Sequence, residues 1–248
     1  MIDIHTHILP YMDDGADSWE NALAMAKLAV KSGVTALIAT PHCGLPGQET
    51  EGRVELLREQ LGRFQNKLVR ANVPLNVYEG MEIFGTPDTA HLLRRGVLTT
   101  LNGSHYPLIE FPFERYARQA TAILDEVLSL GYRPVVAHPE RYQYVQMDPV
   151  ILNVWMDMGC LLQVNRGSLL GRFGPAAEEL SRTMAARGFL CAVASDAHSP
   201  VSRTTRMKDV YDLLSKEYSG QTARLLLEEN PARLLRNEEI DLPEPVWF

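Results

Sequence analysis

The sequence predicts an α/β protein whose short parallel strands alternate with helices and close into a barrel. Its 248 residues contain seven short apolar runs separated by stretches with helical periodicity, an alternation that is typical of a parallel sheet. Histidines or carboxylates follow six of these seven runs. A closed barrel brings all strand ends to one rim, whereas an open sheet would spread them along an edge. We therefore expect residues 1–248 to form a single barrel domain.

The predicted elements follow one another in a regular order. The strands are expected at residues 2–7, 34–40, 75–78, 106–110, 134–137, 161–164 and 190–194. Helices are expected up to residue 32 and at 53–71, 90–95, 117–130, 149–158, 176–187, 205–216 and 221–229. Asp17, with Glu20 three residues later, is the expected N-cap of the first helix, and Gly33 ends it. Asn230 and Pro231 are expected to end the last one.

The composition limits the classes of function. The chain is acidic, with a formal net charge of -7, and has no block of lysines or arginines, which argues against nucleic acid as a partner. No apolar run approaches the roughly 18 residues of a membrane span, and no signal peptide is recognisable, so we expect no membrane insertion. The odd number of cysteines (Cys43, Cys160 and Cys191) indicates free thiols. We therefore expect a cytoplasmic protein.

The first strand carries the clearest chemical signal. His5 and His7 are one residue apart, so an extended backbone points both side chains to the same face at the end of the strand. Two imidazole nitrogens placed in this way can bind one metal ion. Taken alone, the pair is equally consistent with two polar residues leaving a strand for a loop.

Residues of metal-binding type recur along the chain. Such a set suits two or three divalent ions, because each ion takes about four to six donors. Clustered carboxylates also need cations to offset their mutual repulsion. Mixed nitrogen and oxygen ligands suit manganese, iron or zinc. The candidate metal ligands are His5, His7, Asp14, His42, Glu82, Glu110, His138, Asp196 and His198.

Individual members of this set have simpler interpretations. Asp14 lies in a glycine turn, where aspartate is a common turn former. Glu79 and Glu82 compete for one role, and Asp196 with His198 could cap a helix. Chance placement of such residues at so many strand ends is much less plausible than at any one of them.

These motifs together resemble the PHP (polymerase and histidinol phosphatase) superfamily. The resemblance rests on HTH at 5–7, TPH at 40–42, AHPERY at 137–142 and SDAH at 195–198, and it covers nearly the whole chain. HILP…DDG at 7–15, EGMEI at 79–83 and IEFP at 109–112 are most similar to the bacterial manganese-dependent protein-tyrosine phosphatases of capsule and exopolysaccharide operons. The resemblance implies a distorted (β/α)7 TIM-like barrel of the PHP type with a trinuclear centre. Manganese is then the favoured ion, with iron, zinc or magnesium as alternatives.

The resemblance also implies roles for individual residues. All nine candidates become metal ligands, with Asp14 and His198 also taking part in catalysis, and Arg141 and Arg203 bind phosphate. The loop around Arg203 reads Ser-Arg-Thr-Thr rather than the glycine-arginine-proline pattern of this branch, so Arg206 is an alternative to Arg203. A second departure is the pair Tyr11-Met12, where smaller residues are usual.

The resulting functional hypothesis is hydrolysis of protein phosphotyrosine by attack of a metal-bound hydroxide. The expected partner is a phosphotyrosine-containing protein, a bacterial tyrosine autokinase that controls capsule or exopolysaccharide synthesis. A small-molecule phosphatase, such as one acting on histidinol phosphate, is the alternative. A nuclease of the same superfamily is disfavoured by the acidic charge, and a metal-binding regulator without turnover would have no need for open metal positions.

One motif suggests a cysteine-dependent phosphatase but is not expected to be functional. Cys160 and Arg166 have the C-x5-R spacing of cysteine-dependent tyrosine phosphatases. Such a loop wraps phosphate with successive backbone N–H groups, whereas the intervening residues here are typical of a strand. We therefore expect Cys160 to be a core residue.

Overall fold

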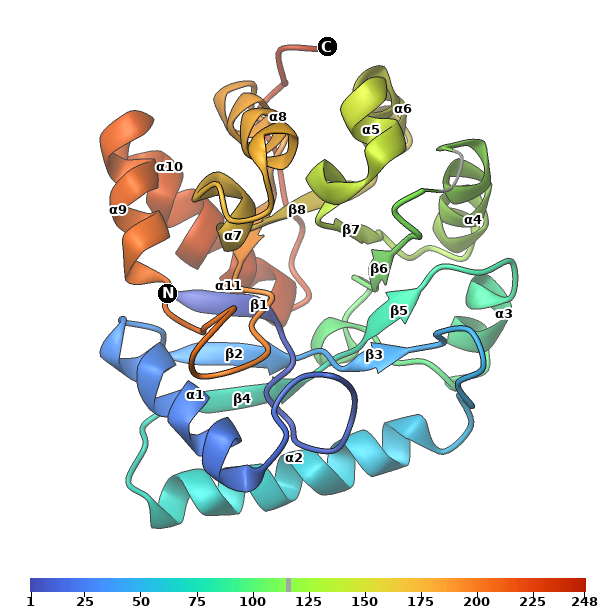
Figure 1. Ribbon diagram of the computed structural model, residues 1–248. Helices are drawn as coiled ribbons and strands as arrows, with labels where there is room; N and C mark the ends of the chain where they lie inside the picture. The colour runs from blue at the N-terminus through green and yellow to red at the C-terminus, as the bar shows by residue number, and fades with distance from the viewer. Residues whose placement is uncertain (115–116) are drawn as a thin grey trace.

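The computed structural model describes residues 1–114 and 117–248 and confirms the α/β barrel (Figure 1). Parallel strands surround a central axis, and most helices lie on the outside of them. The strands are β1 (Ile2–Thr6), β2 (Ala36–Ala39), β3 (His42–Cys43), β4 (Asn76–Glu79), β5 (Glu82–Phe84), β6 (Leu108–Glu110), β7 (Val135–Ala137), β8 (Leu161–Asn165) and β9 (Ala192–Ala194).

The strands form two parallel sheets that meet around the barrel. One sheet has the order β1-β2-β4 and the other the order β3-β5-β6-β7-β8-β9. Backbone contacts between the end of β1 and the segment that follows β9 close the ring: the His7 amide donates to the Ala197 carbonyl at 2.9 Å, and Thr6 pairs with Ala197. The carboxyl ends of the strands therefore converge on one rim, as in other (β/α) barrels.

Two of the expected strands are interrupted, which corrects the sequence-based placement of His42 and Glu82. The sequence placed each residue beyond the end of a strand. Instead, His42 begins β3 after a break at Pro41, and Glu82 begins β5 and pairs in register with His42. Proline lacks the N–H needed for the ladder, and a Cβ on Gly80 would lie 2.7 Å from Ile38 Cγ2. The chain therefore bends at both points and resumes in the second sheet.

Alternate strand residues pack on opposite sides of the sheet. Val135, Leu161 and Ala192 belong to a buried cluster in the barrel interior. Their neighbours Val136 and Leu162 join a larger cluster that includes side chains of the surrounding helices. This period of two is the alternation expected of strands buried on both faces.

The helices follow the predicted order with small shifts. The N-cap of the first helix is Ser18, whose hydroxyl accepts from the Asn21 amide at 3.2 Å; Asp17 instead bonds the Asn21 side chain. Two short helices, α5 and α7, were not predicted. The helices are α1 (Trp19–Lys31), α2 (Arg53–Arg70), α3 (Thr89–Arg94), α4 (Ala117–Ser129), α5 (Gln143–Met147), α6 (Val150–Asp157), α7 (Arg166–Leu169), α8 (Pro175–Ala186), α9 (Lys208–Glu217), α10 (Gly220–Arg224) and α11 (Asn230–Leu235).

The expected stop at Asn230 and Pro231 is wrong. A π-helical turn at Leu225–Glu229 joins α10 to α11, and Pro231 lies in the first turn of α11. The wider turn precedes the residue that lacks an N–H, so the chain continues past the proline as a helix. The buried Asn230 side chain donates to the Cys191 carbonyl at 2.9 Å, which fixes this junction against the sheet.

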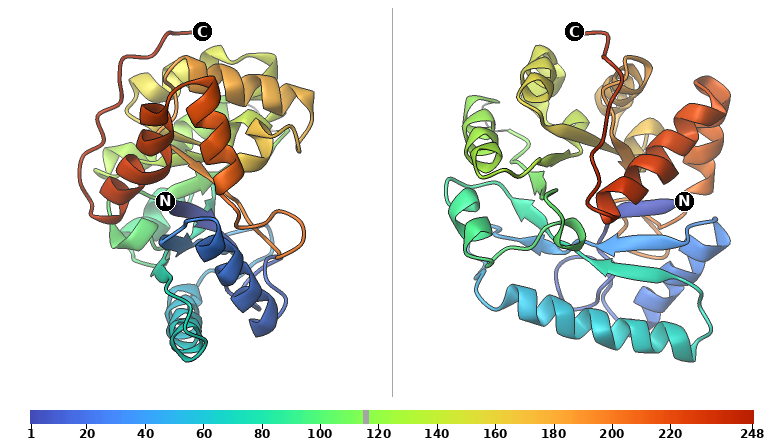
Figure 2. Two further views of the ribbon diagram at one scale, coloured as in Figure 1. Left: turned by 90° about the vertical axis from the view of Figure 1, so that its left-hand side faces the viewer. Right: turned by 180° about the vertical axis from the view of Figure 1, so that it is seen from behind.

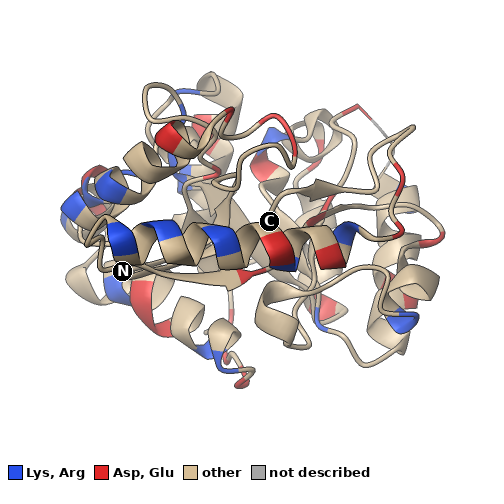
Figure 3. Cartoon of the chain, turned by 90° about the horizontal axis from the view of Figure 1, so that it is seen from below, with Lys and Arg blue, Asp and Glu red and all other residues tan. Residues whose placement is uncertain are grey.

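Helix α2 is amphipathic and lies across the bottom of the molecule in Figure 1. Glu55 lies in its first turn and Lys67 and Arg70 lie in its last turn, while Arg53 and Arg58 add basic charge to its first half; Figure 3 shows the helix from below. The charges of Glu55, Lys67 and Arg70 complement the helix dipole. Within residues 1–114 and 117–248, no helix combines the length and apolar character needed to cross a membrane.

The carboxyl-terminal segment runs along the outside of the barrel (Figure 2). The Val246 amide donates to the Arg187 carbonyl at 2.9 Å, and the Phe248 amide donates to Asn153 Oδ1 at 3.2 Å. The Phe248 ring lies 4.9 Å from the ring of Phe189 and under the guanidinium of Arg187. Arg187 and Phe189 precede β9, so the segment covers the amino-terminal end of the barrel.

We predict that deleting residues 245–248 lowers the free energy of unfolding by about 1–3 kcal/mol, because the deletion exposes Phe189 and removes the packing of Phe248. Urea unfolding of the deletion variant and of wild type measures the difference. Glu244→Gln, a change at an exposed position of the same segment, is the control and should be neutral. Equal stability of the deletion variant and wild type would show that the segment does not stabilise the fold.

Candidate metal centre

The structure brings all nine candidate metal ligands together at the carboxyl end of the barrel. Their nitrogen and oxygen atoms form four overlapping groups, and within each group these atoms lie within 4.8 Å of one another. The strands or the loops that directly follow them supply every member. The groups are His7, Asp14, His42 and His198; His5, His7 and Asp196; His5, Glu82 and His138; and His42, Glu82 and Glu110.

Glu82 lies at the centre of the cluster and is 1% exposed. Its Oε2 atom is 3.1 Å from His5 Nε2, 3.2 Å from His7 Nε2 and 3.0 Å from His42 Nδ1. Its Oε1 atom is 2.8 Å from His138 Nε2. The carboxylate therefore faces four imidazoles at once. Glu79, the competing candidate, instead pairs with Arg58 at 2.8 Å.

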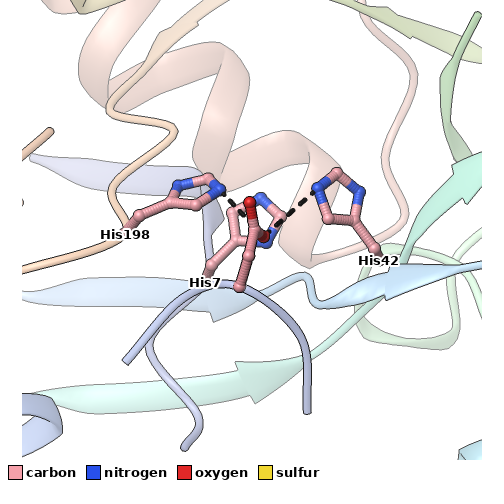
Figure 4. A group of neighbouring side chains, drawn as sticks. His7, His42 and His198 are labelled. Carbon is pink, nitrogen blue, oxygen red and sulfur yellow. Dashed lines mark ion pairs between the residues drawn. The ribbon is translucent and has the colours of Figure 1, made fainter. Parts of the chain in front are cut away.

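Asp14 lies at the exposed edge of the cluster. Its side chain is 67% exposed, and its Oδ1 atom lies 3.4 Å from His198 Nε2 and 3.6 Å from His42 Nε2. Figure 4 shows His7, His42 and His198 arranged around a carboxylate, with dashed lines to two of the rings. This edge offers access from solvent, whereas the Glu82 side is buried.

Asp196 connects the cluster to the two candidate phosphate-binding arginines. Its Oδ1 atom lies 3.6 Å from His5 Nε2 and 3.5 Å from His7 Nε2. Its Oδ2 atom accepts from Arg141 at 3.3 Å and lies 2.5 Å from Arg203 NH2. One oxygen of this carboxylate thus faces two imidazoles, and the other faces two guanidinium groups.

Arg203, not Arg206, lies at the cluster. The Arg203 Nε–H donates to the Asp196 carbonyl at 3.2 Å, in addition to the side-chain contact. Arg206 is exposed and lines a separate groove with Lys31 and Lys208. Glu140, the neighbour of Arg141 in the sequence, forms no ion pair with it. Glu140 is fully buried and accepts from the Asn165 amide and the Ser168 hydroxyl.

Three hydrogen bonds orient the imidazoles, and two of them come from side chains that the sequence analysis does not single out. Asp13 Oδ2 lies 2.6 Å from His7 Nδ1, and Gln163 Oε1 lies 3.0 Å from His5 Nδ1. His198 Nδ1 lies 3.0 Å from the Asp196 carbonyl. Each contact takes one ring nitrogen and leaves Nε2 facing the cluster, an arrangement common among metal-binding histidines.

The available signals for these supporting residues were weak. Asp13 precedes Asp14 in the turn, and Gln163 is a polar residue within an otherwise apolar strand.

Two members of the cluster itself also carry unusual backbone geometry. His138 has φ of 35° and Asp196 has φ of 49°, values that non-glycine residues rarely adopt. Such strain concentrates at functional sites.

Burial and close charges shift the pKa values of several groups. Burial opposes ionisation of Asp13, but the neighbouring His7 outweighs it and lowers the pKa of Asp13 to about 2. Burial and the charge of His7 lower the pKa of His198 to about 3. Burial would lower the pKa of His42, but the carboxylates of Glu110 and Glu82, each 3.0 Å from its Nδ1, raise it to about 10. The Asp13 carboxyl is therefore ionised, and His198 presents a neutral imidazole.

The donor set fits divalent metal ions. Glu82 Oε2 and His198 Nε2 are buried atoms without a hydrogen-bond partner among the described residues. Unpaired buried polar atoms are costly, and metal ions bound at the groups to which these two atoms belong would remove that cost. Imidazole nitrogens mixed with carboxylate oxygens are ligands of zinc, iron and manganese.

The C-x5-R motif forms no phosphate loop. Cys160 is buried just before β8, and burial raises the pKa of its thiol to about 12. Arg166 begins α7 and forms an ion pair with Asp209. A protonated, buried thiol is a poor nucleophile, as the sequence interpretation anticipated.

The fold and the donor cluster define a metal-binding α/β barrel protein. Solved barrels with this fold include D-hydantoinase from Thermus sp., 13% identical with a TM-score of 0.55, which covers 98% of this chain and 73% of that chain. An organophosphorus hydrolase from Deinococcus radiodurans is 16% identical with a TM-score of 0.55, covering 94% of this chain and 92% of that chain. At these identities the likeness extends to the fold alone.

The chain belongs to the CpsB/CapC family of capsular polysaccharide synthesis, whose model matches residues 1–236. Tyrosine-protein phosphatase YwqE of Bacillus subtilis is 36% identical over 99% of this chain and 96% of its own length. Tyrosine-protein phosphatase CpsB of Streptococcus pneumoniae is 31% identical over 97% of this chain and 100% of its own. A crystal structure from a study of YwqE and CpsB, described there as unique metal-dependent tyrosine phosphatases, has a TM-score of 0.94 at 35% identity, covering 100% and 99% of the two chains.

We predict that Gly15→Ala lowers metal affinity about 10- to 100-fold, in the range of changes to supporting residues. A Cβ at Gly15 would lie 2.1 Å from the His7 carbonyl oxygen and 2.5 Å from His7 Cβ, so the turn that carries Asp13 must move. Metal bound per chain, titrated with a competing chelator, measures the effect. Gly62→Ala in α2, where a Cβ meets nothing within 4 Å, is the matched control. Equal affinity of both variants would show that the turn does not support the cluster.

Proposed function

We infer that this chain is a metal-dependent tyrosine-protein phosphatase of capsule synthesis. Membership of the CpsB/CapC family and relatives named tyrosine-protein phosphatases support this function. The observation that carries it is the cluster of nine donor side chains with two arginines on one of its carboxylates. A phosphate monoester is an anion, and its hydrolysis is helped both by metal ions bound at the cluster and by arginine guanidinium groups that contact the phosphoryl oxygens.

We assign all nine clustered residues as metal ligands for two or three divalent ions, with manganese favoured by the family resemblance. His5, Glu82 and His138 form a group deep in the barrel, and Asp14, His42 and His198 form one at the solvent edge. Bound ions would lower the pKa of a water molecule toward neutrality and offset charge on the phosphoryl oxygens.

The protein's own residues then bind and orient the substrate. Arg141 and Arg203 each retain guanidinium N–H groups beyond those that contact Asp196, and this planar fork suits phosphoryl oxygens. Asp14 Oδ1 and His198 Nε2 lie 3.4 Å apart at the solvent edge. We propose that both residues take part in catalysis: the carboxylate oxygen of Asp14 that is not used as a ligand holds the proton that moves between water and the leaving tyrosyl oxygen, and His198, whose Nε2 faces the donor cluster, positions that carboxylate.

We propose further that the substrate is a phosphotyrosine-containing protein, specifically a bacterial tyrosine autokinase that controls capsule or exopolysaccharide synthesis. We also propose that the enzyme is cytoplasmic and that residues 1–248 form a single domain. A substrate of this size fits a site whose edge, at Asp14, is exposed to solvent.

Hydrolysis of a phosphotyrosyl peptide tests the function directly. We predict turnover that depends on added manganese, stops after chelation and returns when the metal is restored. Histidinol phosphate should be a much poorer substrate, as measured by kcat/KM. Preferential turnover of histidinol phosphate would instead indicate a small-molecule phosphatase.

Cys160→Ser is the control for the chemistry, because it replaces the thiol that a cysteine-dependent mechanism would require. The variant should keep most of its activity and its metal dependence. A trapped covalent phosphocysteine would overturn the metal-dependent mechanism.

We predict that Arg141→Ala and Arg203→Ala each lower kcat/KM about 10- to 100-fold. A lost charge-assisted hydrogen bond is worth about 1.5–3 kcal/mol, which corresponds to that range. Metal content should stay unchanged. Arg206→Ala removes an equal charge from a separate groove and should leave kcat/KM unaltered. A silent Arg203→Ala together with an impaired Arg206→Ala would reassign the role to Arg206.

A further inference from the structure

An aromatic ring lies against both arginines of the site. The guanidinium carbon of Arg141 lies 4.4 Å from the ring centroid of Phe173, and that of Arg203 lies 5.9 Å from the same centroid. Phe113 lies 4.7 Å from Arg141. Arg141 therefore contacts two rings, and Phe173 is the ring that contacts both cations. Contacts of this length are within the range of cation–π attraction.

These ring contacts address a problem that the hydrogen bonds leave open. Arg141 and Arg203 converge on the same oxygen, Oδ2 of Asp196. Two long, flexible side chains with like charge repel each other, and one shared carboxylate oxygen does not fix the plane of the Arg141 guanidinium, whereas Arg203 also donates through its Nε–H to the Asp196 carbonyl. The face of an aromatic ring attracts both guanidinium cations, and this contact also limits how far each group can rotate.

Phe173 is itself fixed by the backbone beside it. It lies between α7 and α8, and a Cβ on Gly167 would come within 2.5 Å of its ring, so the ring packs directly on the glycine. The Arg172 amide donates to the Gly167 carbonyl at 2.8 Å, which closes the turn. Ser168, next to Gly167, donates to Glu140 at 2.5 Å and so connects α7 to the turn that carries Arg141.

We propose that Phe173 is a positioning residue that holds the guanidinium groups of Arg141 and Arg203 toward the phosphoryl group of the substrate. This inference rests on the proposed function. Phe173 needs no contact with the substrate, because it acts through the two cations.

Direct binding of inorganic phosphate to the manganese-loaded protein, measured by calorimetry, tests the proposal. Phe173→Leu should weaken phosphate binding about 2- to 30-fold, the range of a cation–π contact, with metal content and melting temperature unchanged. Phe173→Tyr keeps a ring face and should bind as wild type does. Phe173→Met, a second variant that removes the ring, should match Phe173→Leu. Wild-type affinity in the Leu and Met variants, or equal weakening in the Tyr variant, would overturn the proposal.

Phe113→Leu is the matched control, because among the described contacts Phe113 lies against Arg141 and not Arg203. In an Arg141→Ala background, Phe113→Leu should have no further effect on phosphate binding, whereas Phe173→Leu should still weaken it through Arg203. With both arginines replaced, Phe173→Leu should be silent. An effect that persists without either arginine would show that Phe173 does not act through them.

The result can be separated from failure of the proposed function. A wild-type protein that neither binds phosphate nor hydrolyses a phosphotyrosyl peptide would count against the function itself. Wild-type binding and hydrolysis, with no change in Phe173→Leu, would count against Phe173 alone.

Discussion

The burial of the Glu82 carboxylate is the constraint on which the rest of the site depends. An ionised group removed from water costs several kcal/mol unless cations and hydrogen bonds surround it. Burial would raise the pKa of Glu82, but His5, His138 and His42 around it lower that pKa well below its usual value. Those imidazoles come from three separate strands or the loops after them. Only a closed barrel places so many strand ends around one buried carboxylate.

The same constraint separates what the sequence could predict from what it could not. A parallel strand is readable as an apolar run, so the residues that follow it, such as His138 and Asp196, were placed correctly at the rim. Glu82 lies in a strand of three residues, and its position depends on pairing with His42 across a break in both strands. The sequence left the choice between Glu79 and Glu82 open. Glu79 is paired with Arg58 outside the donor cluster, and Arg58 lies 21 positions away along the chain.

The supporting hydrogen bonds were hidden for a related reason. Gln163 bonds His5 across 158 positions, and no local pattern signals such a contact. These partners matter because a neutral imidazole presents its lone pair on only one nitrogen, and the bond at Nδ1 decides that it is Nε2. Helix ends show the same dependence on distant contacts. The last helix passes Pro231 because the buried Asn230 reaches Cys191, although the local sequence favours a stop.

The fold itself leaves the reaction undetermined, since hydantoinases and an organophosphorus hydrolase share it at 11–16% identity. The particular chemistry of this chain must come from what surrounds the donor cluster. Asp196 connects the donor cluster to the two arginines, because one of its oxygens faces the imidazoles and the other faces Arg141 and Arg203. A change in the charge or position of this carboxylate is therefore felt by the donor cluster and by both arginines. Positions of the metal ligands and of the anion-binding groups are thus coupled through a single side chain, whose left-handed backbone at φ 49° the surrounding barrel must hold in place.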